Sequence, residues 1–182
     1  CCNGGGSSVT SGIATVSGTL TFEGEAGDSR KQVFGPGQIH AQGDIQVLQL
    51  GLRGDVNIVI NGAGDQDLIG IASPTSEQGR LPSVTINKSS GTLTITDSIR
   101  IAESWTYQQG TLVTTGSTVI FHIGPDANPN TDVTVSGTHT LNNVTIEFVN
   151  CCNGRNFIID SGTLTVAGTT LITEDGGSNN KY

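Results

Sequence analysis

The phrase SGTLTITD at Ser90–Asp97 is the strongest indication of the fold, because close copies of it recur along the chain. The copies are SGTLTFEG from Ser17, QGTLVTTG from Gln109, SGTHTLNN from Ser136 and SGTLTVAG from Ser161. They begin 73, 19, 27 and 25 residues apart, and three units of roughly two dozen residues fill the longest interval. A unit of this length with one strand and one turn is typical of a β-solenoid, in which each coil buries its inward face on the next.

Apolar and polar residues alternate within the units, as at Leu93 and Ile95 and at Val133 and Val135. Alternation with period two indicates half-buried strands. Glycine at the start of the phrase permits a positive φ at a corner. We therefore predict an all-β protein, a parallel β-solenoid with irregular loops. A jelly-roll β-sandwich with strand exchange between subunits remains the alternative.

The 182 residues predict a single β-rich repeat domain, residues 1–182. Its end segments, residues 1–32 and 151–182, are related: they align without a gap at an offset of 150 residues, and both open with CCNG. Residues 24–81 are less regular, and we expect an insertion or a cap there. DIQVLQLG and DVNIVINGAG within that stretch nevertheless have the pattern of strands.

The charge of the chain excludes several classes of partner. Sixteen acidic residues against eight Lys and Arg give a net charge of −8. This argues against a nucleic-acid groove and against binding to an anionic membrane surface. Apolar runs such as VIFHI are too short to cross a bilayer. No apolar segment follows a basic start, so we expect no signal peptide. We expect no nucleic-acid partner and no membrane insertion. Because the chain has no methionine, we expect a processed product or a fragment.

One stretch, from Ser90 to Thr173, carries a family resemblance. It contains SWTYQQGTLVTTGSTVIF, then HTLNNVTI, then GTLTV. This series resembles the Thr/Gly-rich repeats of large bacterial surface and adhesin-like proteins, and it covers somewhat under half of the chain. The resemblance implies a parallel β-solenoid outside the cell with a structural or adhesive role.

The four cysteines form two adjacent pairs and are the candidate disulfide and assembly residues: Cys1, Cys2, Cys151 and Cys152. Neighbouring Cα atoms are about 3.8 Å apart, too close for a bond within a pair. In a solenoid the two pairs lie several coils apart, so they meet when the start of one subunit stacks on the end of the next. Disulfides within one chain, and free or zinc-bound thiols, remain alternatives. Adjacent cysteines lack the usual zinc spacing.

Two further sets of residues are candidate carbohydrate sites. We expect Trp105, Tyr107 and Phe121 to lie in the core, with glycan contact by an exposed Trp105 and Tyr107 pair as the alternative. Asn87 in NKS and Asn143 in NVT are candidate glycosylation sites in a host that modifies them.

We expect no catalytic residue, no metal and no cofactor. His40, His122 and His139 lie in no recognisable motif. NGAGDQDLIG, from Asn61, is similar to a calcium-binding nonapeptide, but Gln66 stands where that repeat has Asp. The remaining candidates are acidic residues in loops, and no pattern fixes two of them at a glycosidase spacing of about 5–9 Å. These residues are Asp65, Asp67, Glu77, Glu103 and Asp126.

The related ends suggest a function. An open strand edge is a template for another strand, and a head-to-tail contact that does not close produces a filament. We therefore expect a non-enzymatic structural subunit of an extracellular filament or surface fibre, with copies of itself as partner and cross-subunit disulfides. An adhesin or glycan-binding module, with glycans or other cell-surface material as partner, is one alternative. A polysaccharide-degrading β-helix enzyme is another.

Overall fold

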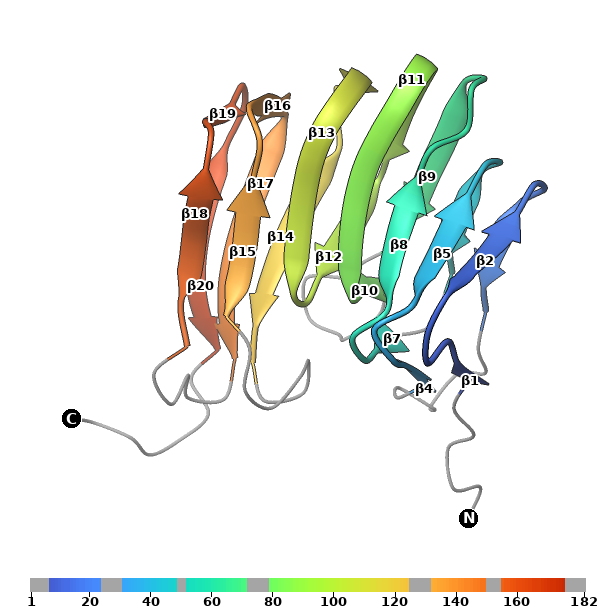
Figure 1. Cartoon of the computed structure of the whole chain (residues 1–182). Coiled ribbons are helices and arrows are strands. Elements are labelled where there is room, and N and C mark those ends of the chain that lie inside the picture. Colours follow the sequence, from blue (N-terminus) through green and yellow to red (C-terminus); the bar gives the residue numbers. More distant parts are fainter. Residues whose placement is uncertain are drawn as a thin grey trace.

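The computed structural model describes residues 7–23, 31–48, 52–71, 79–124, 132–149 and 155–175, and all regular structure in these ranges is β-strand. The chain winds so that each strand lies beside its equivalent in the next coil (Figure 1). Every strand pair described is parallel. The chain is therefore a parallel β-solenoid, as predicted. The jelly-roll alternative is wrong, because that fold pairs its strands antiparallel.

Each coil has three faces, which we name A, B and C in the order in which the chain crosses them. Face A is built from two ladders that meet where β7 lies against β10. Its strands are β1 (Ser7–Ser8), β4 (Lys31–Phe34), β7 (Leu52–Arg53), β10 (Arg80–Leu81), β12 (Ser98–Ile101), β14 (Thr118–Ile123), β17 (Asn143–Val149) and β20 (Thr170–Asp175).

Faces B and C share two long strands, because β11 and β13 each continue from one face onto the other. Face B holds β2 (Ile13–Val16), β5 (Gln38–Ala41), β8 (Asn57–Ile60), the first parts of β11 (Ser83–Thr96) and β13 (Ser104–Val113), β15 (Val133–Ser136) and β18 (Phe157–Ser161). Face C holds β3 (Leu20–Phe22), β6 (Ile45–Val47), β9 (Gln66–Gly70), the second parts of β11 and β13, β16 (His139–Leu141) and β19 (Leu164–Val166).

The coils vary in length around the predicted two dozen residues. Gln38 pairs with Asn57 and Trp105 pairs with Val135, which gives coil lengths of 19 and 30 residues at the two extremes. The interval between the first two copies of the repeated phrase is filled by β6 and β9, which connect β3 to β11. The described part of residues 24–81 thus supplies strands β4 to β10 of the same stack.

The core runs along the axis of the solenoid, between the three faces. Inward side chains are the apolar members of the alternating pattern, and Leu93, Val133 and Val135 are fully buried. Trp105 and Phe121 are the largest aromatic side chains in the core. Each buried aliphatic or aromatic side chain contributes about 1.5–3 kcal/mol relative to exposure. Hydrophobic contact between successive coils therefore holds the stack together, while the ladders supply the hydrogen bonds.

The glycine of the repeated phrase lies at the corner between faces B and C, where successive coils touch. Gly137 has a φ of +88°, and a Cβ atom there would collide with the backbone oxygen of Tyr107. A Cβ on Gly162 would lie 2.5 Å from the carbonyl carbon of Gly137. Side chains are excluded at this corner because the next coil passes too close, which is why the phrase repeats its glycine.

The stack relates the two ends of the chain at an offset different from the one that aligns CCNG. Leu20 begins β3 and Leu164 begins β19, so the phrases SGTLTF and SGTLTV lie on the same face 144 residues apart. An offset of 150 residues would instead put β2, on face B, over β19, on face C. The 150-residue alignment is therefore one face out of step with the coils.

Candidate functional site: the end faces of the solenoid

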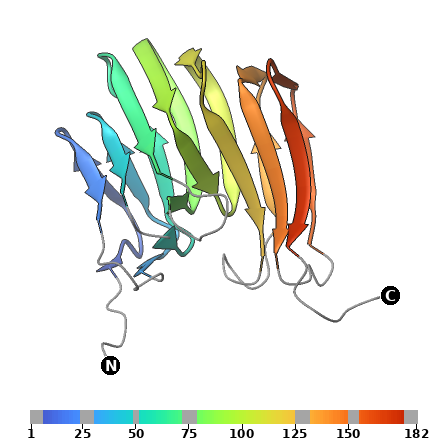
Figure 2. The same ribbon diagram turned by 180° about the vertical axis from the view of Figure 1, so that it is seen from behind.

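The cysteine pairs lie outside the described residues. Cys1, Cys2, Cys151 and Cys152 therefore keep their predicted roles in disulfides without a structural account. The nearest strand after the first pair is β1, and β17 and β18 flank the second pair. β1 and β18 lie at opposite ends of the stack (Figure 2).

The candidate glycan contact Trp105 lies wholly within the core. It is 0% exposed, and its indole nitrogen donates a hydrogen bond to Nε2 of His139 at 2.9 Å. Tyr107 is half-buried, stacks on the His139 ring at 5.2 Å between centroids, and donates its hydroxyl to the Gly110 oxygen at 2.5 Å. Trp105 thus lies in the core, as expected, and Tyr107 packs against the core.

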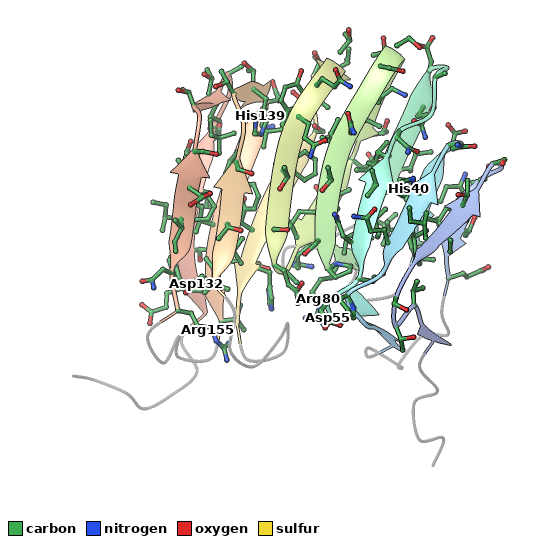
Figure 3. All side chains as sticks on the ribbon, in the orientation of Figure 1. His40, Asp55, Arg80, Asp132, His139 and Arg155 are labelled. Carbon is green, nitrogen blue, oxygen red and sulfur yellow. The ribbon has the colours of Figure 1, made fainter. Side chains whose placement is uncertain are left out.

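His139, labelled in Figure 3, is a neutral imidazole with both nitrogens in use. Nε2 accepts from Trp105, so Nδ1 carries the proton and faces the Gly137 oxygen at 3.2 Å. Burial lowers the pKa of His139, and the hydrogen bond to Gly137 only partly opposes that shift. His139 therefore links β16 to β13 through its contacts with Trp105 and Tyr107.

Sequence reasoning missed a buried polar cluster at the B–C corner. The Lys88 ammonium donates to the oxygens of Gly62 and Gly64 and to Oε1 of Gln66, at 2.7–2.8 Å. The Gln66 amide nitrogen in turn donates to the backbone oxygens of Ala41 and Gly43. Burial lowers the pKa of Lys88, against the opposing charge of Asp65. The cluster satisfies backbone groups where β11 departs from regular pairing.

A second buried cluster lies on face A, across three neighbouring strands. Nε of Arg100 donates to Oε1 of Glu147 at 2.5 Å, and Nδ1 of His122 lies 2.7 Å from the same oxygen. Burial raises the pKa of the Glu147 carboxyl, but the hydrogen bonds and charges of His122 and Arg100 outweigh it and lower that pKa overall. The sequence signal for this cluster was one polar residue between two apolar ones, in IRI, FHI and IEF.

The two candidate glycosylation sites are half-buried within the stack. Oδ1 of Asn87 accepts from the Gln109 amide at 2.8 Å. Nδ2 of Asn143 donates to the Ser117 oxygen at 3.2 Å, and its Oδ1 accepts from the Thr169 amide at 2.9 Å. The Asn143 nitrogen that a glycan would modify therefore already bridges two coils.

Aspartates in the turns act as clamps between coils. Asp65 accepts from the backbone nitrogen of Thr92 at 2.8 Å, and Asp44 from that of Asp67 at 3.0 Å. At the corner between faces A and B, Asp55 accepts from the backbone nitrogen of Gly35 and Asp132 accepts from that of Asn156 (Figure 3).

Of the remaining loop acids, Glu103 accepts from the Ser83 hydroxyl at 3.0 Å. Glu77 and Asp126 lie outside the described residues. In the described part of the chain, no group of three or more His, Cys, Asp or Glu side chains is placed to hold a metal ion. Nor do those residues include a helix able to span a membrane.

The described surfaces that lack a neighbouring strand are the two ends of the stack. We name β1, β2 and β3 the N-terminal end face, and β18, β19 and β20 the C-terminal end face. Among the described strands, each of these six pairs on one side only. Ile13 is 61% exposed on the first, and Ile159, Leu171 and Ile172 are 49%, 53% and 67% exposed on the second. Both ends thus present hydrogen-bonding edges together with exposed apolar side chains.

The end faces also resemble each other in sequence where they are equivalent in structure. SGTLTF, ending in β3, and SGTLTV, ending in β19, differ in one residue of six. Within the chain, β19 lies on β16 with Leu164 paired to His139 and with Gly162 against Gly137. Because SGTLTF has the same glycine and leucine as SGTLTV, β3 can pack on a preceding coil at the B–C corner as β19 packs on β16. Comparisons with protein-family models, with curated proteins and with solved structures found no match to this chain.

Proposed function

We propose that the protein is a structural subunit of an extracellular filament or surface fibre, and that copies join head to tail through their end faces. The observation that carries this proposal lies at the opposite ends of one stack: parallel strand edges that pair with no other described strand, together with exposed apolar residues. Such edges invite further strands, since each exposed N–H and C=O gains a partner and apolar surface leaves water.

The relation between the two end faces favours a filament over a closed pair. The C-terminal end face of one copy meets the N-terminal end face of the next, so each addition presents a fresh C-terminal end face. Contacts of this heterologous kind continue indefinitely unless the rotation closes a ring. Copies then add along the axis of the stack, one end face on the next.

The extracellular setting rests on the cysteines and on the family resemblance. We propose that Cys1 and Cys2 of one copy form disulfides with Cys151 and Cys152 of its neighbour, which requires an oxidising compartment. The resemblance of residues 90–173 to Thr/Gly-rich repeats of bacterial surface and adhesin-like proteins is consistent with that location. Stiffness would follow, because most strands of a continuous stack are hydrogen-bonded on both sides.

The test is electron microscopy of the concentrated protein, together with electrophoresis with and without reductant. We expect unbranched fibres with an axial repeat of roughly 34 Å, one strand spacing for each strand in the path from β2 to β18. We also expect a ladder of covalent multimers that reductant collapses. A protein that remains monomeric at high concentration under oxidising conditions would overturn the proposal, and release of reducing sugar by that monomer would support the enzyme alternative.

A further inference from the structure

The C-terminal end face is stepped. Strands β17, β18 and β19 make one coil across faces A, B and C, and β20 then returns to face A and pairs with β17. In the described part of the chain, face A therefore extends one strand further than faces B and C at this end. Ile172 points inward on β20 at the position where Phe121 and Ile146 stand on the strands before it, yet it is 67% exposed. Among the described strands, none continues the coil that β20 begins onto faces B and C.

The N-terminal end face offers those two strands. β2 lies on face B and β3 on face C, and each is the first strand of its ladder. The third strand of this face, β1, is much shorter than β20. It forms two residue pairs with β4, whereas β20 forms six with β17.

We propose that adjoining copies share one coil, made of β20 from one copy and β2 and β3 from the next. This inference rests on the proposed head-to-tail function and specifies its interface. β2 lies on β18, β3 lies on β19, and β20 takes the place of β1 beside β4. The displacement of β1 loses two residue pairs, and β20 gains a neighbour on its open side.

The existing ladders set the register of the shared coil. On face B, one inward column passes through Ala14 at its first position and Ile159 at its last, with Ile39, Ile58, Val84, Trp105 and Val135 between them. The intervening side chains are buried, whereas Ala14 and Ile159 are exposed. Continuing the column places Ala14 of one copy on Ile159 of the other. The neighbouring outward column places Ile13 beside Ile158.

On face C the repeated phrase sets the same register. Leu20 of the second copy pairs with Leu164 as Leu164 pairs with His139. This arrangement brings Gly18 over Gly162. A Cβ on Gly18 meets nothing within 4 Å in the single chain, whereas a Cβ on Gly43 would lie 2.5 Å from the oxygen of Gly18. The glycine at position 18 is therefore unnecessary for one chain and required in a stack.

The first test uses two variants that each disable one end. Ala14→Arg places a charge in the column that the shared coil buries, and Ile172→Arg does so on β20. Both positions are exposed in the single chain, so we expect both variants to fold. Each alone should remain monomeric under conditions where the wild type forms fibres. Mixed together they should form a one-to-one dimer that grows no further, because each supplies the end that the other lacks.

Matched control variants test whether loss of assembly depends on the inward position of the substituted residue or only on adding a charge to an end face. Thr15→Arg and Leu171→Arg change exposed residues adjacent to those positions, on the outward sides of the same strands. We expect both controls to form fibres. Gly18→Ala should keep the thermal stability of the dilute monomer and reduce fibre formation at least tenfold. Equal loss of assembly in the inward and outward variants would overturn the shared coil.

A second test maps the register directly. Thr21 and Thr165 are exposed, outward residues that immediately follow Leu20 and Leu164. A photoreactive p-benzoylphenylalanine in place of Thr21 should cross-link fibres to peptides that contain Thr165. Cross-links elsewhere on fibres that do form would sink this inference and leave the proposed function standing. Absence of fibres from the wild type would sink the proposed function itself.

Discussion

Lys88 shows how a single side chain supplies hydrogen bonds to the backbone of a neighbouring coil. Lys88 is 1% exposed, and its ammonium donates hydrogen bonds to three oxygens of the preceding coil. Lys88→Met keeps the length of the side chain and removes the donors. We expect the free energy of unfolding to fall by about 2–3 kcal/mol, because buried acceptors lose a charged partner. Urea unfolding of the dilute monomer measures this change.

The control for Lys88 is Ser90→Ala. Ser90 donates to the Ala63 oxygen at 2.7 Å at an exposed position of the same corner. Water can replace that hydroxyl, so we expect a change below about 0.5 kcal/mol. Equal effects of the two substitutions would contradict the role assigned to the buried ammonium.

His139 makes the stability depend on pH. Its pKa in the folded chain lies below the ordinary 6.5, so between these two values the unfolded chain binds more protons. The stability is complete above pH 6.5 and is lost as pH falls through the folded pKa. His139→Gln keeps a hydrogen-bonding side chain and removes the titration. The urea midpoint should fall less between pH 7 and pH 5 in this variant than in the wild type, and identical slopes would refute the assignment.

At the scale of elements, the corner between faces B and C depends on glycine for space and for backbone conformation. Gly137 combines a positive φ with a Cβ position that the Tyr107 oxygen occupies. Gly137→Ala should therefore lower the unfolding free energy by about 2–3 kcal/mol. Gly18→Ala, in the same phrase but with open space around the Cβ, should leave the dilute monomer nearly unchanged. Calorimetry of both variants measures whether the loss of stability follows the close contact at Gly137 and is absent at Gly18.

The elements themselves were largely predictable from the sequence. Leu93, Ile95, Val133 and Val135 alternate with polar residues, and all four are buried on strands as period two requires. The two clusters, around Lys88 and around Glu147, were not predictable. Each joins residues more than twenty positions apart, and coil lengths vary from 19 to 30, so spacing alone does not say which side chains meet.

For the whole molecule, the proposed shared coil predicts that stability depends on protein concentration. Assembly consumes folded monomer, so by mass action the wild-type melting temperature should rise with protein concentration. Ala14→Arg and Ile172→Arg should each melt at one temperature across the same range, and their equimolar mixture should again show a rise. Scanning calorimetry over a hundredfold range measures this. A concentration-independent wild type would argue against assembly.

The sequence by itself determined that the chain is a β-solenoid, because alternating apolar residues and recurring corner glycines are local signals that every coil repeats. The tertiary structure alone decided how the ends relate. It set the structural offset at 144 residues, one face away from the 150 that aligns CCNG, and it left β20 one strand beyond its neighbours on the other faces. Because the coils differ in length, the sequence offset between stacked residues changes from coil to coil. Only the pairing of the strands therefore shows which residues lie above one another.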